Sequence, residues 1–98
     1  METRFTGKNK VYWSNGRLMY DGNYTLGVRD GHWEEYYPNG KLMSKGNYIN
    51  GNKEGYWEEY HDNGEICSKG CYKNDEEIGE WLYFNTKKIL VNREYTII

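Results

Sequence analysis

The sequence predicts an all-β protein in which stacked hairpins form a single-layer antiparallel sheet of about eight strands. Three observations support this fold class. Ala and Gln are absent, so strong helix formers are scarce. Gly, Asn and aromatic residues are abundant, with 12 glycines and an aromatic content of 17%, which is typical of strands and tight turns. A motif also recurs every 24 residues, and the repeat of 24 residues predicts that the same small unit is built several times.

The repeat runs without a gap from Gly7 to Phe84. Its columns are Gly7, Gly31, Gly55 and Gly79; Tyr12, Tyr36, Tyr60 and Phe84; Trp33, Trp57 and Trp81; Asn15-Gly16, Asn39-Gly40 and Asn63-Gly64; Leu18, Leu42 and Ile66; Gly22, Gly46 and Gly70; and Tyr24, Tyr48 and Tyr72. We treat residues 1–98 as one domain, with units at about 7–30, 31–54, 55–78 and 79–98. The last unit is degenerate, because Lys87-Lys88 replaces Asn-Gly, and a degenerate unit is typical of a terminal cap.

Each unit predicts one hairpin. In the second unit, residues 31–37 and 41–48 are the expected strands, and Asn39-Gly40 is the dipeptide of a two-residue type I′ turn with φ > 0 at both positions. Such a turn fixes the register. It pairs Trp33 with Gly46, Glu34 with Lys45, Tyr36 with Met43 and Tyr37 with Leu42. The equivalent pairs of the third and first units are Glu58 with Lys69 and Lys10 with Asp21, so opposite charges face each other in all three hairpins.

Because strand side chains alternate, this register predicts two different faces. Trp33, Leu42, Gly46 and Tyr48 share one face, which we expect to form the core. The indole of Trp33 should lie across Gly46, and that of Trp57 across Gly70. The opposite face is mostly polar, and its one aromatic column is Tyr12, Tyr36, Tyr60 and Phe84. This column could be a packed spine or a strip that contacts a partner.

The unit from Gly31 to Gly55 resembles the MORN-variant repeat, a bacterial relative of the membrane occupation and recognition nexus repeat. The resemblance rests on the spacing Gly-x-Trp, Tyr-x-x-Asn-Gly and Gly-x-Tyr, and it covers about residues 7–84. Proteins built only of such repeats include antitoxin-like proteins, so the resemblance implies that the chain acts by binding a partner.

No residue pattern predicts catalysis, and we expect neither a cofactor nor a metal site. Cys67 and Cys71 are too far apart along one strand face to bridge, so we expect two free thiols. His32 and His61 do not converge on them in the predicted register. Glu34 and Glu58 already have Lys partners, and a paired, solvated carboxylate is a poor general acid. Nucleophile elbows and phosphate loops are absent from the sequence.

The charge is uneven along the chain. Residues 1–53 carry a net charge of +3 and residues 54–98 a net charge of −5. A basic patch is missing, so direct binding of nucleic acid is not expected. The longest uninterrupted apolar run is Trp81–Phe84, which is too short to span a membrane, and the sequence has no polybasic anchor. We therefore expect a soluble, cytoplasmic protein and do not expect it to bind membranes.

These observations predict a non-enzymatic module that binds another protein and occludes a basic surface on it. Such a protein would act as an inhibitor or neutralising partner, antitoxin-like or of the kind that phages direct against a host defence enzyme. The alternatives are a structural adaptor or self-assembling scaffold and, more weakly, a lipid-surface module. We expect a monomer or weak dimer. The predicted partner-binding residues are Tyr12, Tyr36, Tyr60, Met43, Glu58, Glu59, Asp75, Glu76 and Glu77.

Overall fold

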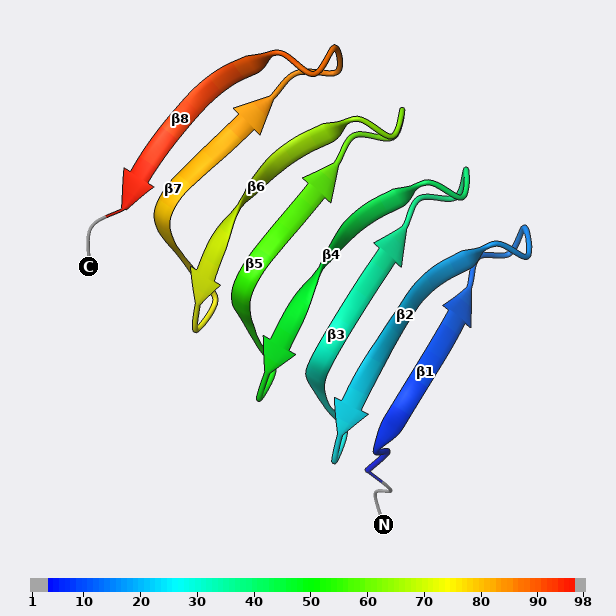
Figure 1. Ribbon diagram of the computed structural model, residues 1–98. Coiled ribbons are helices and arrows are strands. Elements are labelled where there is room, and N and C mark those ends of the chain that lie inside the picture. The colour runs from blue at the N-terminus through cyan, green and yellow to red at the C-terminus, as the bar shows by residue number, and fades with distance from the viewer. Residues whose placement is uncertain (1–3, 97–98) are drawn as a thin grey trace.

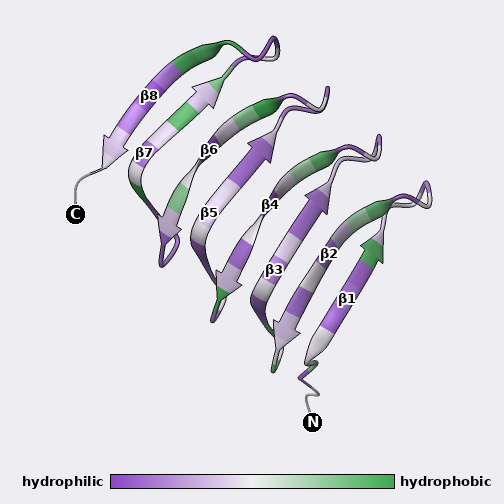
Figure 2. Ribbon diagram, viewed as in Figure 1, coloured by the Kyte–Doolittle hydropathy of each residue, from purple (hydrophilic) through white to green (hydrophobic). Residues whose placement is uncertain are grey.

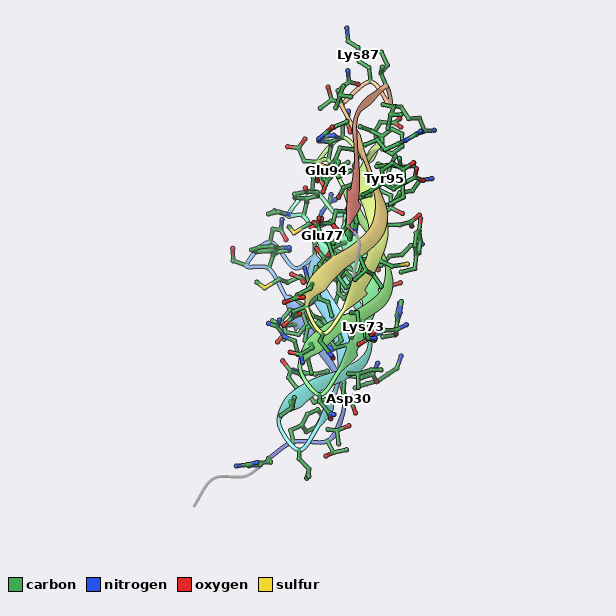
Figure 3. The ribbon with its side chains drawn as sticks, turned by 90° about the vertical axis from the view of Figure 1, so that its left-hand side faces the viewer. Asp30, Lys73, Glu77, Lys87, Glu94 and Tyr95 are labelled. Carbon is green, nitrogen blue, oxygen red and sulfur yellow. The ribbon has the colours of Figure 1, made fainter. Side chains whose placement is uncertain are left out.

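The computed structural model describes residues 4–96, which form one antiparallel sheet of eight strands in sequence order (Figure 1). The strands are β1 Gly7–Tyr12, β2 Leu18–Thr25, β3 Val28–Tyr36, β4 Leu42–Ile49, β5 Asn52–Tyr60, β6 Ile66–Lys73, β7 Glu76–Phe84 and β8 Leu90–Thr96. The sheet measures 48 × 38 × 16 Å and has side chains on both sides when it is seen edge-on (Figure 3). The predicted all-β fold of stacked hairpins is therefore confirmed.

The turns differ from the prediction in kind. At the Asn39-Gly40 turn only Gly40 has a positive φ, of 91°. The amide of Gly40 donates to the carbonyl of Tyr37, and that of Tyr37 donates to Lys41, so the loop has three residues rather than two. Two-residue turns with positive φ at both positions lie at the other ends of the strands, away from the three-residue turns. They are Leu26-Gly27, Asn50-Gly51 and Asn74-Asp75, which join one hairpin to the next.

A β-bulge corrects the register after each three-residue turn. Tyr36 pairs with Leu42, whereas Glu35 pairs with Ser44, so Met43 is the extra residue. The predicted pairs Tyr36 with Met43 and Tyr37 with Leu42 are therefore wrong. Beyond the bulge, the pairs Glu34 with Lys45 and Trp33 with Gly46 are as predicted. Leu42 lies opposite Tyr36, on the face of Glu34, and not on the face of Trp33 as we expected.

The core is aromatic and lies on one side of the sheet, which we call the Trp face; the opposite side is the polar face. Trp33, Trp57 and Trp81 are only 1–2% exposed although the sheet has a single layer. Tyrosine rings pack between them, so that Tyr48 lies edge-on to Trp33 at 5.7 Å and to Trp57 at 5.2 Å between ring centroids. Aliphatic residues contribute little to this core. Figure 2 places the most apolar segments of β2, β4, β6 and β8 near the three-residue turns.

Each of the three buried tryptophans covers the glycine of the preceding hairpin, not of its own. A Cβ added to Gly46 would lie 2.1 Å from Cδ2 of Trp57, and the same relation holds for Gly22 with Trp33 and for Gly70 with Trp81. The predicted placements of Trp33 across Gly46 and Trp57 across Gly70 are thus wrong by one hairpin. The indole Nε1 of Trp57 also donates to the carbonyl of Asn47, at 3.1 Å. This contact joins neighbouring units, so no hairpin completes its core alone.

A bend in every second strand makes room for the indole. Between β4 and β5, Lys45 pairs with Glu58 and Asn47 pairs with Glu54. The single residue Gly46 therefore lies opposite three residues of β5, Gly55 to Trp57. Gly55 has a φ of 80°, which favours glycine, and β3, β5 and β7 curve at their starts (Figure 1). The invariant column Gly31, Gly55 and Gly79 therefore marks the bend.

We expect Gly40→Val to destabilise the protein by about 1–2 kcal/mol or more, because a β-branched residue is strained at a φ of 91°. Asn39→Ala would test the other residue of the dipeptide. The φ of Asn39 is not positive, so this variant loses only the hydrogen bonds of the Asn39 side chain. Urea unfolding measures both variants. A Gly40→Val variant that unfolds at the wild-type midpoint would contradict the turn.

Candidate protein-binding surface

The predicted tyrosine column lies on the polar face, but its members differ in exposure. Tyr12, at the β1 edge, is 56% exposed. Tyr36 and Tyr60 are half-buried, and their hydroxyls donate to carboxylates on the same strand, to Glu34 at 2.9 Å and to Glu58 at 2.6 Å. Burial, and then the hydrogen bond to Glu34, raises the pKa of Tyr36 to about 12. The two inner rings are therefore held in place by the face itself.

Glu58 is the centre of a hydrogen-bonded group on this face. Its carboxylate accepts hydrogen bonds from Tyr60 and from Tyr56, the latter at 2.8 Å, and lies 3.4 Å from Nζ of Lys45. Burial acts to raise the pKa of Glu58, but the hydrogen bonds from the two tyrosines and Lys45 outweigh it and lower that pKa. The carboxylate is thus ionised and internally satisfied, which leaves little of it for a partner.

Lys45 forms its ion pair with the neighbouring hairpin and not with its predicted partner Glu34. Lys45 faces both Glu34 and Glu58 across its two neighbouring strands, and its Nζ reaches Glu58. Lys69, the predicted partner of Glu58, instead has its Nζ 5.8 Å from the ring centroid of Phe84. Sequence register alone does not fix the partner of Lys45, because Lys45 has an acidic neighbour on either side, whereas Lys69 lies between Glu58 and Leu82.

The acidic candidates are divided between the two faces. Glu59 follows Glu58 and points to the Trp face, where it accepts a hydrogen bond from the hydroxyl of buried Ser68 at 3.0 Å. Asp75 belongs to a turn, and its side chain accepts from the amide of Lys53. Glu76 is exposed and lies opposite Lys73 in the strand ladder. The structure therefore does not bring the predicted carboxylates together as one set.

Met43 and the cysteines are the remaining candidates for chemistry or contact. Met43 is the bulged residue of β4 and is half-buried. Cys67 and Cys71 are free thiols, as predicted, and burial followed by the charge of Glu59 raises the pKa of Cys67. His61, which we considered as a ligand, uses Nε2 for a 2.8 Å hydrogen bond to the carbonyl of Phe84. Within residues 4–96, His, Cys, Asp and Glu do not gather into a group that could hold a metal ion.

An acidic patch forms on the Trp face at its C-terminal end. It consists of Glu59, Asp75, Glu77 and Glu94. Glu77 lies opposite Tyr72 in the ladder, and Glu94 lies opposite Trp81. Burial, and then the charges of Glu59, Glu77 and Asp75, raises the pKa of Tyr72 to about 12, so three of these carboxylates act on one hydroxyl. The hydroxyl of Tyr83 donates to Glu77 at 3.2 Å.

Glu94 joins this patch from the last strand. Burial, then hydrogen bonding to Glu94 and the charge of Glu77, raises the pKa of Tyr83, so both carboxylates act on one hydroxyl. The sequence prediction missed Glu94. The signal was present, because Glu94 occupies the position of Gly22, Gly46 and Gly70 in the repeat, and an acidic residue in a glycine column is a marked departure.

The part of the chain that the structure describes contains no helix long and apolar enough to cross a membrane. A search of curated proteins gave no match. The family model for the MORN repeat variant matches residues 5–25, 29–50 and 53–74, which together make up more than half of the chain. Repeats of this family are generally non-catalytic binding modules. The 24-residue unit and its Trp-over-Gly stacking are thus the form that this repeat takes here, and the chain belongs to the MORN repeat variant family.

Proposed function

We propose that this chain is a protein-binding module that covers a basic surface of its partner, and so acts as an inhibitor or neutralising protein. The observation that supports it is the acidic patch. Glu59, Asp75, Glu77 and Glu94 lie near Tyr72 and Tyr83 on the Trp face, and Nζ of Lys53 lies 5.0 Å from the Tyr72 ring centroid. Aromatic rings beside carboxylates that form no ion pair within residues 4–96 suit a partner rich in Lys and Arg.

The composition of the patch predicts how binding would proceed. Exposed carboxylates attract a basic partner from a distance and raise the association rate, and this effect weakens as salt screens the charges. Tyrosine contacts then slow dissociation, because a large ring is buried with few rotatable bonds to immobilise. The polar face offers less net negative charge, since Lys45 lies opposite both Glu34 and Glu58 and forms an ion pair with Glu58.

A charge-reversal pair tests this assignment. The immobilised chain is used to capture proteins from its native host, and association rates are then measured with the captured partner. Glu77→Lys with Glu94→Lys should lower the association rate by roughly tenfold at low salt and far less at high salt. The matched control, Asp62→Lys with Glu76→Lys, makes the same change in net charge at exposed positions outside the patch. Equal effects of the two pairs would show that net charge, and not the patch, matters.

The tyrosine column remains a second candidate contact on the polar face. If a partner packs on it, Tyr60→Ala should weaken binding by about 2 kcal/mol. Because Tyr60 also donates to Glu58, the variant must be compared in folding and in binding. Tyr12→Ala is the cleaner test, since Tyr12 is 56% exposed. A Tyr60→Ala variant that is folded and binds normally would remove this column from the interface.

We expect a monomer rather than a self-assembling scaffold. If β8 paired with β1 of a second copy in the register that β6 uses with β7, Arg93 would face Lys10, and like charges directly opposite are destabilising. Glu94 replaces the glycine and Asn9 replaces the tryptophan, so the contact that joins the inner hairpins cannot form at this junction. Sedimentation velocity should give one species of about 11.7 kDa. Concentration-dependent polymers would favour the scaffold function instead.

A further inference from the structure

A hollow of about 290 Å³ opens on the Trp face at the β1 end of the sheet. Phe5, Asn9, Tyr24 and Gly27 line it. Two hydrogen bonds hold its walls in place: the amide of Gly27 donates to the carbonyl of Phe5 at 2.8 Å, and the amide of Leu26 donates to the side-chain Oγ1 of Thr6 at 2.8 Å. The hollow is therefore preformed, and it lies at the other end of the sheet from the acidic patch.

Two of the equivalent positions flank a tryptophan ring in the second unit. A step of 24 residues leads from Phe5, Asn9, Tyr24 and Gly27 to Arg29, Trp33, Tyr48 and Gly51. There the Arg29 guanidinium lies 5.0 Å from the Trp33 ring centroid, and Tyr48 packs edge-on to that ring at 5.7 Å.

The third unit repeats this arrangement with Lys53, Trp57 and Tyr72. Nζ of Lys53 lies 4.9 Å from the Trp57 centroid, and Tyr72 packs edge-on at 6.2 Å. In both units the fold thus places an indole between the basic side chain and the tyrosine ring. In the first unit the tryptophan is replaced by Asn9, whose short side chain leaves Phe5 and Tyr24 in edge-to-face contact at 6.1 Å with open space beside them.

We propose that this hollow receives an aromatic side chain, tryptophan above all, from the protein that the chain binds. Its volume exceeds the roughly 150 Å³ of a cavity that takes up benzene. The guest ring would pack edge-to-face on Tyr24, as Trp33 does on Tyr48, with Phe5 in the place of the cation. The proposal rests on the proposed function only in that the partner is a protein; it adds an aromatic anchor, remote from the acidic patch.

A ligand titration tests the hollow without the partner. N-acetyl-tryptophanamide, the probe for a tryptophan residue, is titrated into the full chain and followed by amide chemical shifts in NMR. We expect saturable shifts at Phe5, Asn9, Tyr24 and Gly27, with a dissociation constant on the order of millimolar for so small a ligand. N-acetyl-leucinamide should bind at least roughly fivefold more weakly, because it lacks the edge-to-face contact.

Two tryptophan substitutions on one strand provide the matched control. Asn9→Trp restores the repeat residue and should abolish the shifts, whereas Lys8→Trp adds the same indole on the opposite face of β1 and should leave them unchanged. Phe5→Ala should weaken the probe by roughly fivefold.

Several results would overturn the proposal: no saturable binding, equal binding of the leucine analogue, or unchanged binding by a folded Asn9→Trp chain. With the captured partner, Asn9→Trp should weaken binding at least tenfold and Lys8→Trp should not, and an unchanged affinity for Asn9→Trp would also overturn it. The acidic-patch variants keep this hollow, so they should still bind the probe. Failure at one site is thereby separated from failure at the other.

Discussion

Gly46→Ala should destabilise the protein by about 3 kcal/mol, an unusually large effect for the addition of one methyl group. The new Cβ would lie 2.1 Å from Cδ2 of Trp57, so either the indole or the strand must move. Displacing the ring would also break its hydrogen bond to Asn47 and its edge-to-face contacts with Tyr48 and Tyr72. Trp57→Ala should cost about 3–5 kcal/mol, the usual range for truncating a buried aromatic residue.

The control for Gly46→Ala is Asn47→Ala, which changes the next residue on the exposed face and should shift stability by less than about 0.5 kcal/mol. Combining Gly46→Ala with Trp57→Phe should cost less than the sum of the single changes, because the smaller ring relieves the clash. Chemical unfolding of the wild type, the two single variants and the double variant gives the coupling free energy between the two positions. Additive effects would mean that Trp57 does not lie on Gly46.

Raising the pH from about 8 to 12 should unfold the protein. Burial, and then nearby carboxylates, raises the pKa of Tyr36, Tyr56 and Tyr72 to about 12, against about 10 in an unfolded chain. A raised folded pKa means that the stability is fully present below pH 10 and is lost as the pH rises through 12, because the unfolded state gives up its protons first. Several such groups together cost several kcal/mol even after screening, which is comparable with the total stability of a small domain.

Circular dichroism and tyrosinate absorbance, followed together across this range, measure the effect. Tyr72→Phe removes one titrating hydroxyl from the Trp face and should make the fall in stability between pH 8 and 11.5 shallower. Tyr12→Phe, at an exposed ring, serves as the matched control. Tyrosines that all ionise near pH 10 while the fold persists would contradict the expectation.

The sequence was sufficient for the fold because repetition amplifies weak local signals: the prediction of one ambiguous strand becomes reliable when its columns recur three or four times. The turn conformation was not predictable in the same way. An Asn-Gly pair fits a two-residue turn, and it equally fits the last positions of a three-residue turn in which Gly40 alone has a positive φ. The bulge at Met43 then restores the predicted register, so charge pairing further along the strands could not reveal the difference.

The placement of the tryptophans exposes a limit of a periodic sequence. Trp33 stands opposite Gly22 on one side and Gly46 on the other, so ladder pairing allows both contacts. The side-chain direction and the bend at Gly31 decide between them, and neither is encoded by column spacing. In contrast, Glu58 and Glu59 could have been separated from the sequence, since adjacent strand residues point to opposite faces.

The placement of each buried tryptophan on the glycine of the unit before it has a consequence for how such proteins change length. The junction between two units uses only residues that every inner unit carries, so a copy of residues 31–54 inserted after Ile78 or removed from the middle creates no new kind of contact. Gene duplication can therefore extend or shorten the sheet by whole units, and with it the reach of the binding face. Asn9 and Glu94, which break the junction, are the two positions that cannot be copied inward.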